Sequence, residues 1–338
     1  MRVISQSVLC FVVLCFVLPA IAAEDGQYPE NAGPYTGDWV GEFTKEEKKH
    51  PEIGAQVIPR GSETYEIVFQ PVLYARTRPF IRLTAKVKDD KLVFDENDYY
   101  GEIYGDSFTG GRHSDGAKFS LERYTRTSPT LGLQAPDNAT IIFDGTSLDA
   151  FKLARTLEQT WEIMPGGILQ AHPDVGNMNT KQRFRDVTLH LEFRLPLMPG
   201  ANGQERANSG VFLQDTFEVQ ILDSYGLPGY WNECGALYQI VAPKVNMCLP
   251  PLQWQTYDIE YRAGRFDDKR NLLELPRITV RHNGVLIHND VELPHGTSYS
   301  AEKGPARPPH RPEFIRLQAH NNRVQYRNIW LVEHKVEE

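Results

Sequence analysis

The sequence has no excess of positive charge. Its 36 Lys and Arg residues are outnumbered by 44 Asp and Glu residues, which gives a formal net charge of −8. Proteins that bind nucleic acid are usually basic on one face, because they neutralise phosphate groups. The charge balance therefore argues against a nucleic-acid partner.

The sequence also lacks a hydrophobic run of membrane-spanning length. The longest apolar segment is Val8 to Leu18, whereas a membrane-spanning helix needs about 20 residues. Arg2 precedes this segment and Ala20-Ile21-Ala22 follows it. A positive start, a short apolar run and an Ala-x-Ala end are typical of a secretory signal peptide. We expect residues 1–22 to be removed and the mature protein to be periplasmic or extracellular, without stable membrane insertion.

Cysteine is scarce, with four residues in the chain. Removal of residues 1–22 leaves Cys234 and Cys248. In an exported protein two cysteines are compatible with one disulfide. They are equally compatible with two buried thiols, which pack as small hydrophobic side chains. The sequence leaves both alternatives open.

Long segments with helical periodicity are absent as well, while short strand-like runs separated by Gly, Pro, Asn and Asp recur throughout. This pattern indicates an all-β protein. Residues 24–127 are predicted to form a small antiparallel sheet or partial barrel of unknown role. Residues 128–139 contain two prolines and a glycine and lack periodicity, which predicts a linker. Residues 140–334 contain ten or more short strands, which predicts two stacked sheets in a jelly-roll sandwich.

Two strands of the second block carry the polar residues of greatest interest. In 187–194, apolar residues alternate with His190, Glu192 and Arg194, and in 217–221 they alternate with Glu218 and Gln220. Alternation with a period of two sends these polar side chains away from the core. If the two strands share a sheet, the polar groups gather on one face and form a candidate site. The alternative is an ordinary solvated sheet surface.

Several motifs of the second block occur together in one order. They are Phe143-Asp144-Gly145, Trp161, Glu192-Phe193-Arg194, Asn208-Ser209-Gly210-Val211-Phe212, Glu218-Val219-Gln220-Ile221-Leu222-Asp223-Ser224, Cys234-Gly235-Ala236-Leu237-Tyr238, Trp254-Gln255-Thr256-Tyr257-Asp258-Ile259, His282-Asn283-Gly284-Val285, Arg316-Leu317-Gln318 with His320, and Tyr326-Arg327-Asn328-Ile329-Trp330. With these motifs the chain resembles the 3-keto-disaccharide hydrolase domain family over roughly residues 140–333. The resemblance implies a concanavalin A-like jelly roll that acts on glycosides oxidised at sugar C3.

A ketone at C3 acidifies the proton on C2, so a base can remove it and the enolate then expels the group at C1. This reaction needs a base, an acid and a donor to the enolate oxygen. We expect Glu218 to act as base or acid with Glu192 as its partner, and His320 to be a further catalytic side chain in a loop. The expected substrate-binding residues are Gln220, Asn208, Arg194, Arg327, Asp223 and Tyr238, of which Arg194 or Arg327 would hold the oxyanion.

Three alternatives remain open. The same pair of carboxylates suits direct glycoside hydrolysis. A divalent metal ion is possible because His190, Glu192, Glu218 and Asp223 mix nitrogen and oxygen donors, although no compact ligand spacing supports a metal site. Asp223 is equally suited to capping the turn that follows it. A non-catalytic carbohydrate-binding module is the main alternative to an enzyme. For that function Tyr225, Tyr230 and Trp231 are expected to be exposed in one loop.

Overall fold

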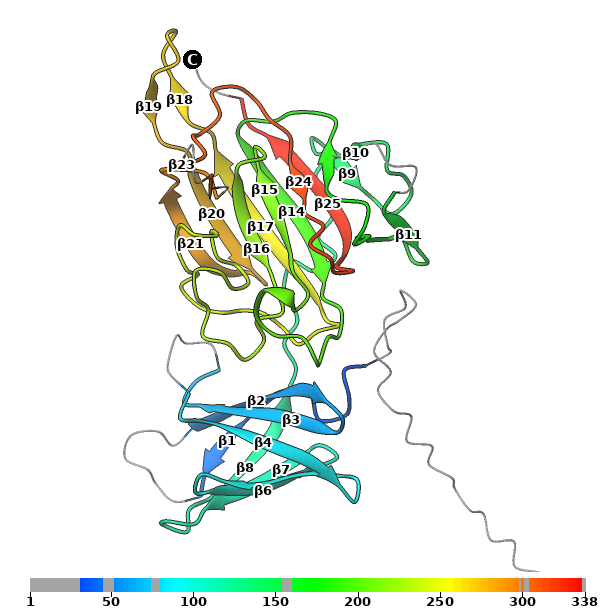
Figure 1. The fold of residues 1–338 in the computed structure, drawn as a ribbon, viewed down its shortest axis with the longest axis vertical. Coiled ribbons are helices and arrows are strands. Elements are labelled where there is room, and N and C mark those ends of the chain that lie inside the picture. The colour runs from blue at the N-terminus through cyan, green and yellow to red at the C-terminus, as the bar shows by residue number, and fades with distance from the viewer. Residues whose placement is uncertain are drawn as a thin grey trace, which may run out of the picture.

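The structure is a computed structural model that describes residues 31–44, 52–73, 79–153, 160–297, 299–300 and 304–335. The expected signal peptide, residues 1–22, lies outside the described residues. The chain forms two all-β units, a small barrel and a two-sheet sandwich (Figure 1). Within the described ranges there is no helix with the length and hydropathy needed to cross a bilayer.

The first unit is a closed barrel of eight strands rather than an open sheet or partial barrel. Each strand pairs antiparallel with the next, and β1 pairs with β8 to close the circle. Asp89 and Asp90 form a two-residue turn between β4 and β5, with φ angles of 49° and 58°. The strands are β1 (Gly37–Phe43), β2 (Glu52–Gly61), β3 (Thr64–Gln70), β4 (Ile81–Lys88), β5 (Lys91–Glu96), β6 (Tyr99–Tyr104), β7 (Ser107–Arg112) and β8 (Lys118–Tyr124).

The second unit is the predicted sandwich. One sheet has five strands in the order β10-β13-β24-β15-β16, and the other has eight, in the order β11-β12-β25-β14-β17-β20-β21 with β9 paired to β25. The five are β10 (Phe151–Leu153), β13 (Met178–Thr180), β24 (Arg316–Leu317), β15 (Ser209–Leu213) and β16 (Phe217–Ile221). The eight are β9 (Thr140–Phe143), β11 (Glu162–Met164), β12 (Ile168–Gln170), β14 (Val187–Arg194), β17 (Trp254–Arg262), β20 (Arg277–His282), β21 (Val285–Glu292) and β25 (Gln325–Glu333).

Short elements lie outside the two sheets. Two small ribbons pair β18 (Arg265–Phe266) with β19 (Leu272–Glu274) and β22 (Tyr299–Ser300) with β23 (Gly304–Pro305). A single 3₁₀ turn, η1 (Gly203–Glu205), precedes β15.

Alternation along the strands builds the core between the two sheets. Leu191 and Phe193 from β14 and Val211 and Val219 from β15 and β16 belong to one buried apolar cluster. Each is fully or almost fully buried. Since burying a side chain of this size contributes roughly 1.5–3 kcal/mol, this layer fixes which face of each strand points outward.

The two cysteines of the sandwich are both buried and free. Of the two alternatives the sequence left open, the structure therefore has the pair of buried thiols. The Cys234 sulfur lies 3.2 Å from the Tyr257 hydroxyl group, inside the core.

Candidate functional site

The two glutamates that the sequence placed on one face lie in different sheets. Glu192 is on β14 of the eight-stranded sheet and Glu218 is on β16 of the five-stranded sheet. Their strand neighbours Leu191 and Val219 point into the shared core, so the two carboxylates point away from it in opposite directions. The expected Glu218–Glu192 pair is wrong, because both strands alternate as predicted but belong to opposite layers.

A row of side chains crosses the outer face of the five-stranded sheet at Glu218. Glu218 pairs in register with Phe212, Phe212 with Arg316, and Arg316 with Asn179. Residues directly opposite each other on paired strands project to the same face. The four side chains therefore lie side by side across β16, β15, β24 and β13.

Arg316 is the cation of this row. Its guanidinium lies over the Phe212 ring, 3.7 Å from the centroid, and Nη1 is 2.6 Å from Asp215 Oδ1. Burial lowers the pKa of Arg316, whereas the nearby carboxylates of Asp215 and Glu218 raise it. The stacking and the ion pair hold the guanidinium over Phe212, the residue that lies between Arg316 and Glu218 in the row.

Glu218 is 6 % exposed. Burial raises the pKa of its carboxyl group to about 8, and the opposing charge of Arg316 offsets only part of that effect. A glycine at position 210 makes room for it, since a Cβ there would lie 2.3 Å from Glu218 Oε1. A carboxyl group that titrates close to neutral pH is suited to proton transfer.

Buried polar atoms without hydrogen-bond partners gather around this row. Such atoms are rare in folded proteins, because each one loses its interactions with water. Gln318 extends the pairing of β24, since its N–H donates to the Gly210 carbonyl at 2.9 Å, and His320 follows it by two residues. A polar ligand on this face would supply the missing partners. Among the described residues the atoms are Asn179 Oδ1, Gln220 Oε1, Arg316 Nε, Gln318 Oε1 and His320 Nδ1.

Gln220 and Asn208 are both held by Gln204 of the 3₁₀ turn η1. Gln220 Nε2 donates to Gln204 Oε1 at 3.1 Å. Asn208 Nδ2 donates to the Gln204 carbonyl at 2.8 Å. Two of the predicted substrate-binding residues are therefore held by one turn, and Gln220 lies two residues from Glu218 on the same face of β16.

The free edge of β16 is covered by the segment that ends at Tyr238. The Tyr238 N–H donates to the Glu218 carbonyl at 3.1 Å, which extends the row by one residue. Trp231 packs edge-to-face against Tyr238, with ring centroids 5.8 Å apart. Trp231 and Tyr230 are 50 % and 54 % exposed, but Tyr225 is 2 % exposed. Tyr225 is therefore not part of an exposed aromatic loop, contrary to expectation.

Glu192 instead fixes the backbone at Gly132 to the outer face of the eight-stranded sheet. It accepts hydrogen bonds from Arg327 Nε at 2.6 Å, Gly132 N at 2.6 Å and Asn328 Nδ2 at 3.0 Å. Although burial opposes ionisation, these donors and His190 lower the pKa of Glu192 to about 2. A carboxylate with donors at both oxygens, one of them the backbone of Gly132, is a structural group.

Arg194 and Arg327 belong to this second region as well. Both guanidinium groups stack on Trp254, at 4.9 Å and 4.1 Å from the ring centroid. Arg194 Nε also donates to Gln325 Oε1 at 2.9 Å. Neither arginine lies on the sheet face that carries Glu218, so neither holds an oxyanion there.

Asp223 caps the turn that follows it. Its Oδ1 accepts a hydrogen bond from Tyr225 N at 3.2 Å, and its Oδ2 accepts one from Arg206 Nε at 2.6 Å. The structure thus favours the capping alternative over contact with substrate.

The four residues considered as metal ligands do not converge, because Glu192 and Glu218 lie in opposite layers and His190 binds Asp258 Oδ1 at 2.6 Å. Across the described ranges, no group of three or more His, Cys, Asp and Glu residues is arranged to hold a metal ion.

Arg316, Gln318 and Asn179 are site residues that the sequence reasoning missed. The alternation Arg316-x-Gln318-x-His320 was visible, and it would have placed three polar side chains on one face. What the sequence did not indicate is that this short strand lies between β13 and β15.

Comparison with known proteins agrees with this fold. Residues 138–332, more than half of the chain, match the model of the 3-keto-alpha-glucoside-1,2-lyase-like domain family. A crystal structure described as "a putative glycosyl hydrolase" from Parabacteroides distasonis ATCC 8503 is 32% identical, with a TM-score of 0.55, over 59% of this chain and 85% of that one. A second structure with the same description and organism is 16% identical, with a TM-score of 0.45, over 59% and 95%. No curated protein matches the chain.

Proposed function

Because the chain belongs to the 3-keto-alpha-glucoside-1,2-lyase-like domain family, we propose that its sandwich cleaves the C1–O bond of 3-keto-glycosides. The family and the related crystal structure support a glycoside-acting hydrolase or lyase. The finer proposal is an elimination that starts with removal of the C2 proton. The single observation that carries it is a buried carboxyl group, Glu218, with a pKa of about 8.

Glu218 is the proposed base. Its carboxylate takes the proton from C2 of the sugar, and the electron pair of that C–H bond forms the C2–C3 enolate. As the ketone re-forms, the C1–O bond breaks and leaves a C1–C2 double bond. The departing oxygen takes a proton, either the one that Glu218 acquired or one from His320. Addition of water to the double bond would complete a net hydrolysis.

Arg316 is the proposed donor to the developing enolate oxygen. Its Nε is buried without a hydrogen-bond partner among the described residues, while Asp215 occupies Nη1. A positioned donor without a partner in the free protein stabilises charge that appears only during the reaction. Gln220, Gln318 and Asn179 would bind sugar hydroxyl groups through the side-chain oxygens that lack partners.

A substrate deuterated at C2 tests the mechanism. Elimination breaks the C2–D bond, so turnover of a C2-deuterated 3-keto-glucoside should be slower. The unsaturated product, or the 3-keto-glucose formed from it by hydration, should lack the label in mass spectrometry. Direct hydrolysis by two carboxylates leaves C2 untouched. Quantitative retention of deuterium together with an unchanged rate would contradict the proposal, because retention alone also results if Glu218 returns the deuteron to C2 during hydration.

A non-catalytic sugar-binding module is the second candidate. The exposed aromatic rings of Tyr230 and Trp231 favour it, since flat aromatic surfaces next to polar groups suit amphipathic ligands. Calorimetric binding of a 3-keto-glucoside without any product after prolonged incubation would support this candidate over the enzyme.

Export remains part of the proposal, supported by the charged and apolar order of residues 1–22. N-terminal sequencing of the protein from its native host tests it.

A further inference from the structure

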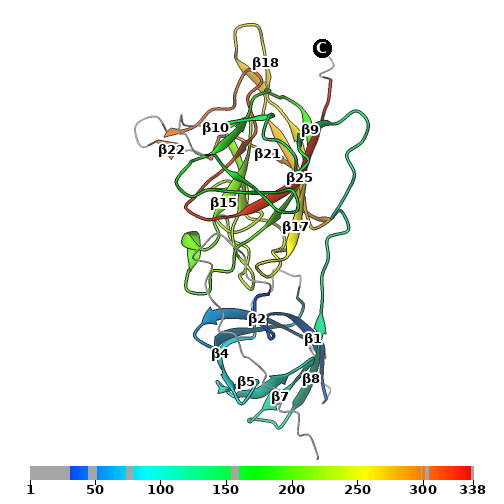
Figure 2. The same ribbon diagram turned by 90° about the vertical axis from the view of Figure 1, so that its right-hand side faces the viewer.

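The barrel lies against the loop that connects β16 to Tyr238. The family match begins at residue 138, so the family accounts for no part of the barrel. Figures 1 and 2 show the barrel below the sandwich, next to the loops at one end of its sheets. Ile58 and Val68 from β2 and β3 belong to the apolar cluster of the sandwich, not to that of the barrel. The contact therefore includes buried apolar side chains from both units.

Asp38 on β1 is the polar centre of this contact. It is 3 % exposed, and its Oδ1 accepts hydrogen bonds from Tyr225 Oη at 2.8 Å and Gln56 Nε2 at 3.0 Å. Its Oδ2 is 2.6 Å from Arg126 Nε, and Arg126 also donates to the Cys248 carbonyl at 3.2 Å. A buried carboxylate with this many donors is a rigid acceptor for the Tyr225 hydroxyl group.

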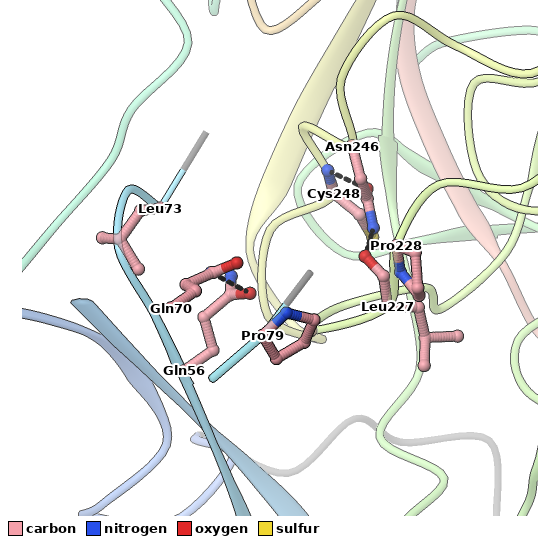
Figure 3. A pocket seen from close by; sticks show the side chains of 9 residues that line it. Gln56, Gln70, Leu73, Pro79, Leu227, Pro228, Asn246 and Cys248 are labelled. Carbon is pink, nitrogen blue, oxygen red and sulfur yellow. Dashed lines mark hydrogen bonds between the residues drawn. The ribbon is translucent and has the colours of Figure 1, made fainter. Parts of the chain in front are cut away.

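The turn after Tyr225 fits closely against the barrel. Gly226 has a φ of 76°, and a Cβ at this position would lie 2.3 Å from Ile58 Cδ1. Arg82 Nη2 donates to the Gly226 carbonyl. A small cavity beside this turn is lined by Gln56 and Gln70 of the barrel and by Leu227 and Asn246 of the sandwich (Figure 3). The barrel thus contacts the turn through the Ile58 side chain and through the hydrogen bond from Arg82.

Hydrogen bonds connect this turn to the segment that carries Tyr230, Trp231 and Tyr238. Ser224 Oγ accepts from Cys234 N at 2.8 Å, and the Ser224 carbonyl accepts from Asn246 Nδ2 at 2.7 Å. Glu233 Oε2 accepts from the backbone N–H groups of Gly229 and Tyr230 at 2.6 Å and 2.9 Å. The loop is therefore closed on itself between Tyr225 and Cys234.

The far end of the loop bonds to the strand that carries Glu218. Gly235 N donates to the Gln220 carbonyl and Gln220 N donates to the Ala236 carbonyl, both at 2.9 Å. Tyr238 N donates to the Glu218 carbonyl at 3.1 Å. A shift of the loop would move the aromatic side chains on it relative to Glu218.

We propose that the barrel is a positioning unit for substrate, in which Asp38 anchors Tyr225 and so fixes the loop that carries Tyr230, Trp231 and Tyr238. This inference rests on the proposed function, because it assigns those aromatic rings to the leaving-group side of the 3-keto-glycoside. Tyr238 continues the row beyond Glu218 at the edge of the sheet, on the side away from Arg316, and the Trp231 ring packs against it. Tyr225 is a positioning residue, since it acts only through the loop.

Tyr225→Phe in the full chain tests the proposal, because it removes one hydroxyl group and keeps the buried ring. Tyr104→Phe is the matched control, since Tyr104 lies on β6 of the barrel and is 60 % exposed. Hydrogen exchange of residues 226–238 and steady-state kinetics with a 3-keto-disaccharide are measured for both variants. We expect Tyr225→Phe to speed exchange in this segment by about five- to tenfold, the effect of one lost hydrogen bond on local opening.

We also expect KM to rise by a similar factor in Tyr225→Phe, with kcat almost unchanged, because the reacting groups on β16 and β24 stay in place. The control should match the native protein in both measurements. Unchanged exchange in Tyr225→Phe would overturn the anchoring role. Faster exchange with unchanged KM would overturn the link to substrate. If the native protein shows no turnover, the proposed function fails, while the exchange experiment still decides whether the barrel holds the loop.

Discussion

Glu218 and Arg316 lie on one face of the five-stranded sheet with the Phe212 ring between them. The arginine is close enough to act electrostatically on the glutamate, yet burial dominates and the pKa of Glu218 stays near 8. A carboxylate with so high a pKa is a stronger base than an exposed one. The pair thus combines a base with a cation for the anion that the base creates.

The rate of the proposed reaction should follow the ionisation of Glu218. Below its pKa of about 8 the carboxyl group is mostly protonated and inactive as a base. We therefore expect kcat/KM to rise about tenfold per pH unit between pH 5.5 and 7.5 and to level off above pH 8, since kcat/KM reports groups of the free enzyme. Initial rates with a 3-keto-glucoside give this profile, after subtraction of the uncatalysed rate at each pH.

Glu218→Asp checks which group is titrating. The shorter side chain changes the surroundings of the carboxyl group, so the midpoint of the profile should move if Glu218 is the base. An identical midpoint in the native protein and the variant would assign the titration to another group.

Arg316→Lys should impair the chemical step more than binding. Lysine keeps the charge but lacks the planar group that stacks on Phe212 and the Nε donor. We expect kcat to fall by roughly a hundredfold, the loss seen when one preorganised donor to a developing oxyanion is removed, with a small change in KM. Arg183→Lys is the matched control, because Arg183 is 48% exposed and pairs with Glu313 at the surface. Equal kcat values in the two variants would remove Arg316 from the mechanism.

Glu192→Gln should destabilise the protein without affecting the chemistry. The substitution removes the ion pair with Arg327. One of the groups that donate a hydrogen bond to the Glu192 carboxylate is left facing the N–H group of the new amide. We expect a loss of about 1.5–3 kcal/mol in urea unfolding at pH 7, and native kcat in the fraction that remains folded. A kcat that falls a hundredfold in folded Glu192→Gln would restore Glu192 to the site.

The stability that Glu192 contributes has a defined pH window. Its pKa in the folded protein, about 2, is lower than the ordinary value of 4.5, so its contribution is complete above pH 4.5 and is lost as the pH falls toward 2. The difference in unfolding free energy between native protein and Glu192→Gln should therefore shrink on acidification. A difference that stays constant between pH 6 and pH 3 would contradict the assignment.

Local signals in the sequence predicted the strands and their inward faces. Alternation placed Leu191 and Val219 in the core, and the Asn283-Gly284 pair, a common two-residue hairpin turn, joins β20 to β21 with positive φ at both residues. These features depend on neighbours within a few residues, and the pleat of a strand enforces them. The family motifs also led to the two-sheet fold.

The pairing of distant strands could not be obtained from local signals. The sequence contained the polar positions at Glu192 and Glu218, but alternation gives the face of a strand and not the sheet to which it belongs. Arg316 reaches the site because β24 inserts between β13 and β15, about a hundred residues later in the chain than β15. The burial that raises the pKa of Glu218 is likewise a property of the assembled sheet.

Glu218→Gln should abolish turnover and stabilise the protein at alkaline pH. The pKa of Glu218 is raised from 4.5 to about 8, so its neutral form is compatible with folding, and its ionisation opposes folding increasingly between these two values. Glutamine has nearly the same shape and never ionises.

Relative to the native protein, Glu218→Gln should therefore gain about 2–4 kcal/mol of unfolding free energy between pH 5 and pH 9, given about 1.4 kcal/mol per pKa unit. Urea unfolding at the two pH values measures it, with Glu260→Gln as the control without such a gain, since Glu260 is an exposed residue of β17. Removal of a general base lowers the rate roughly a hundredfold or more. Loss of turnover together with the gain in unfolding free energy would therefore identify Glu218 as a group that destabilises the fold when ionised and is needed for the reaction. Equal stability of native protein and Glu218→Gln at pH 9 would show that Glu218 ionises at its ordinary pKa, and full activity of the variant would exclude it as the base.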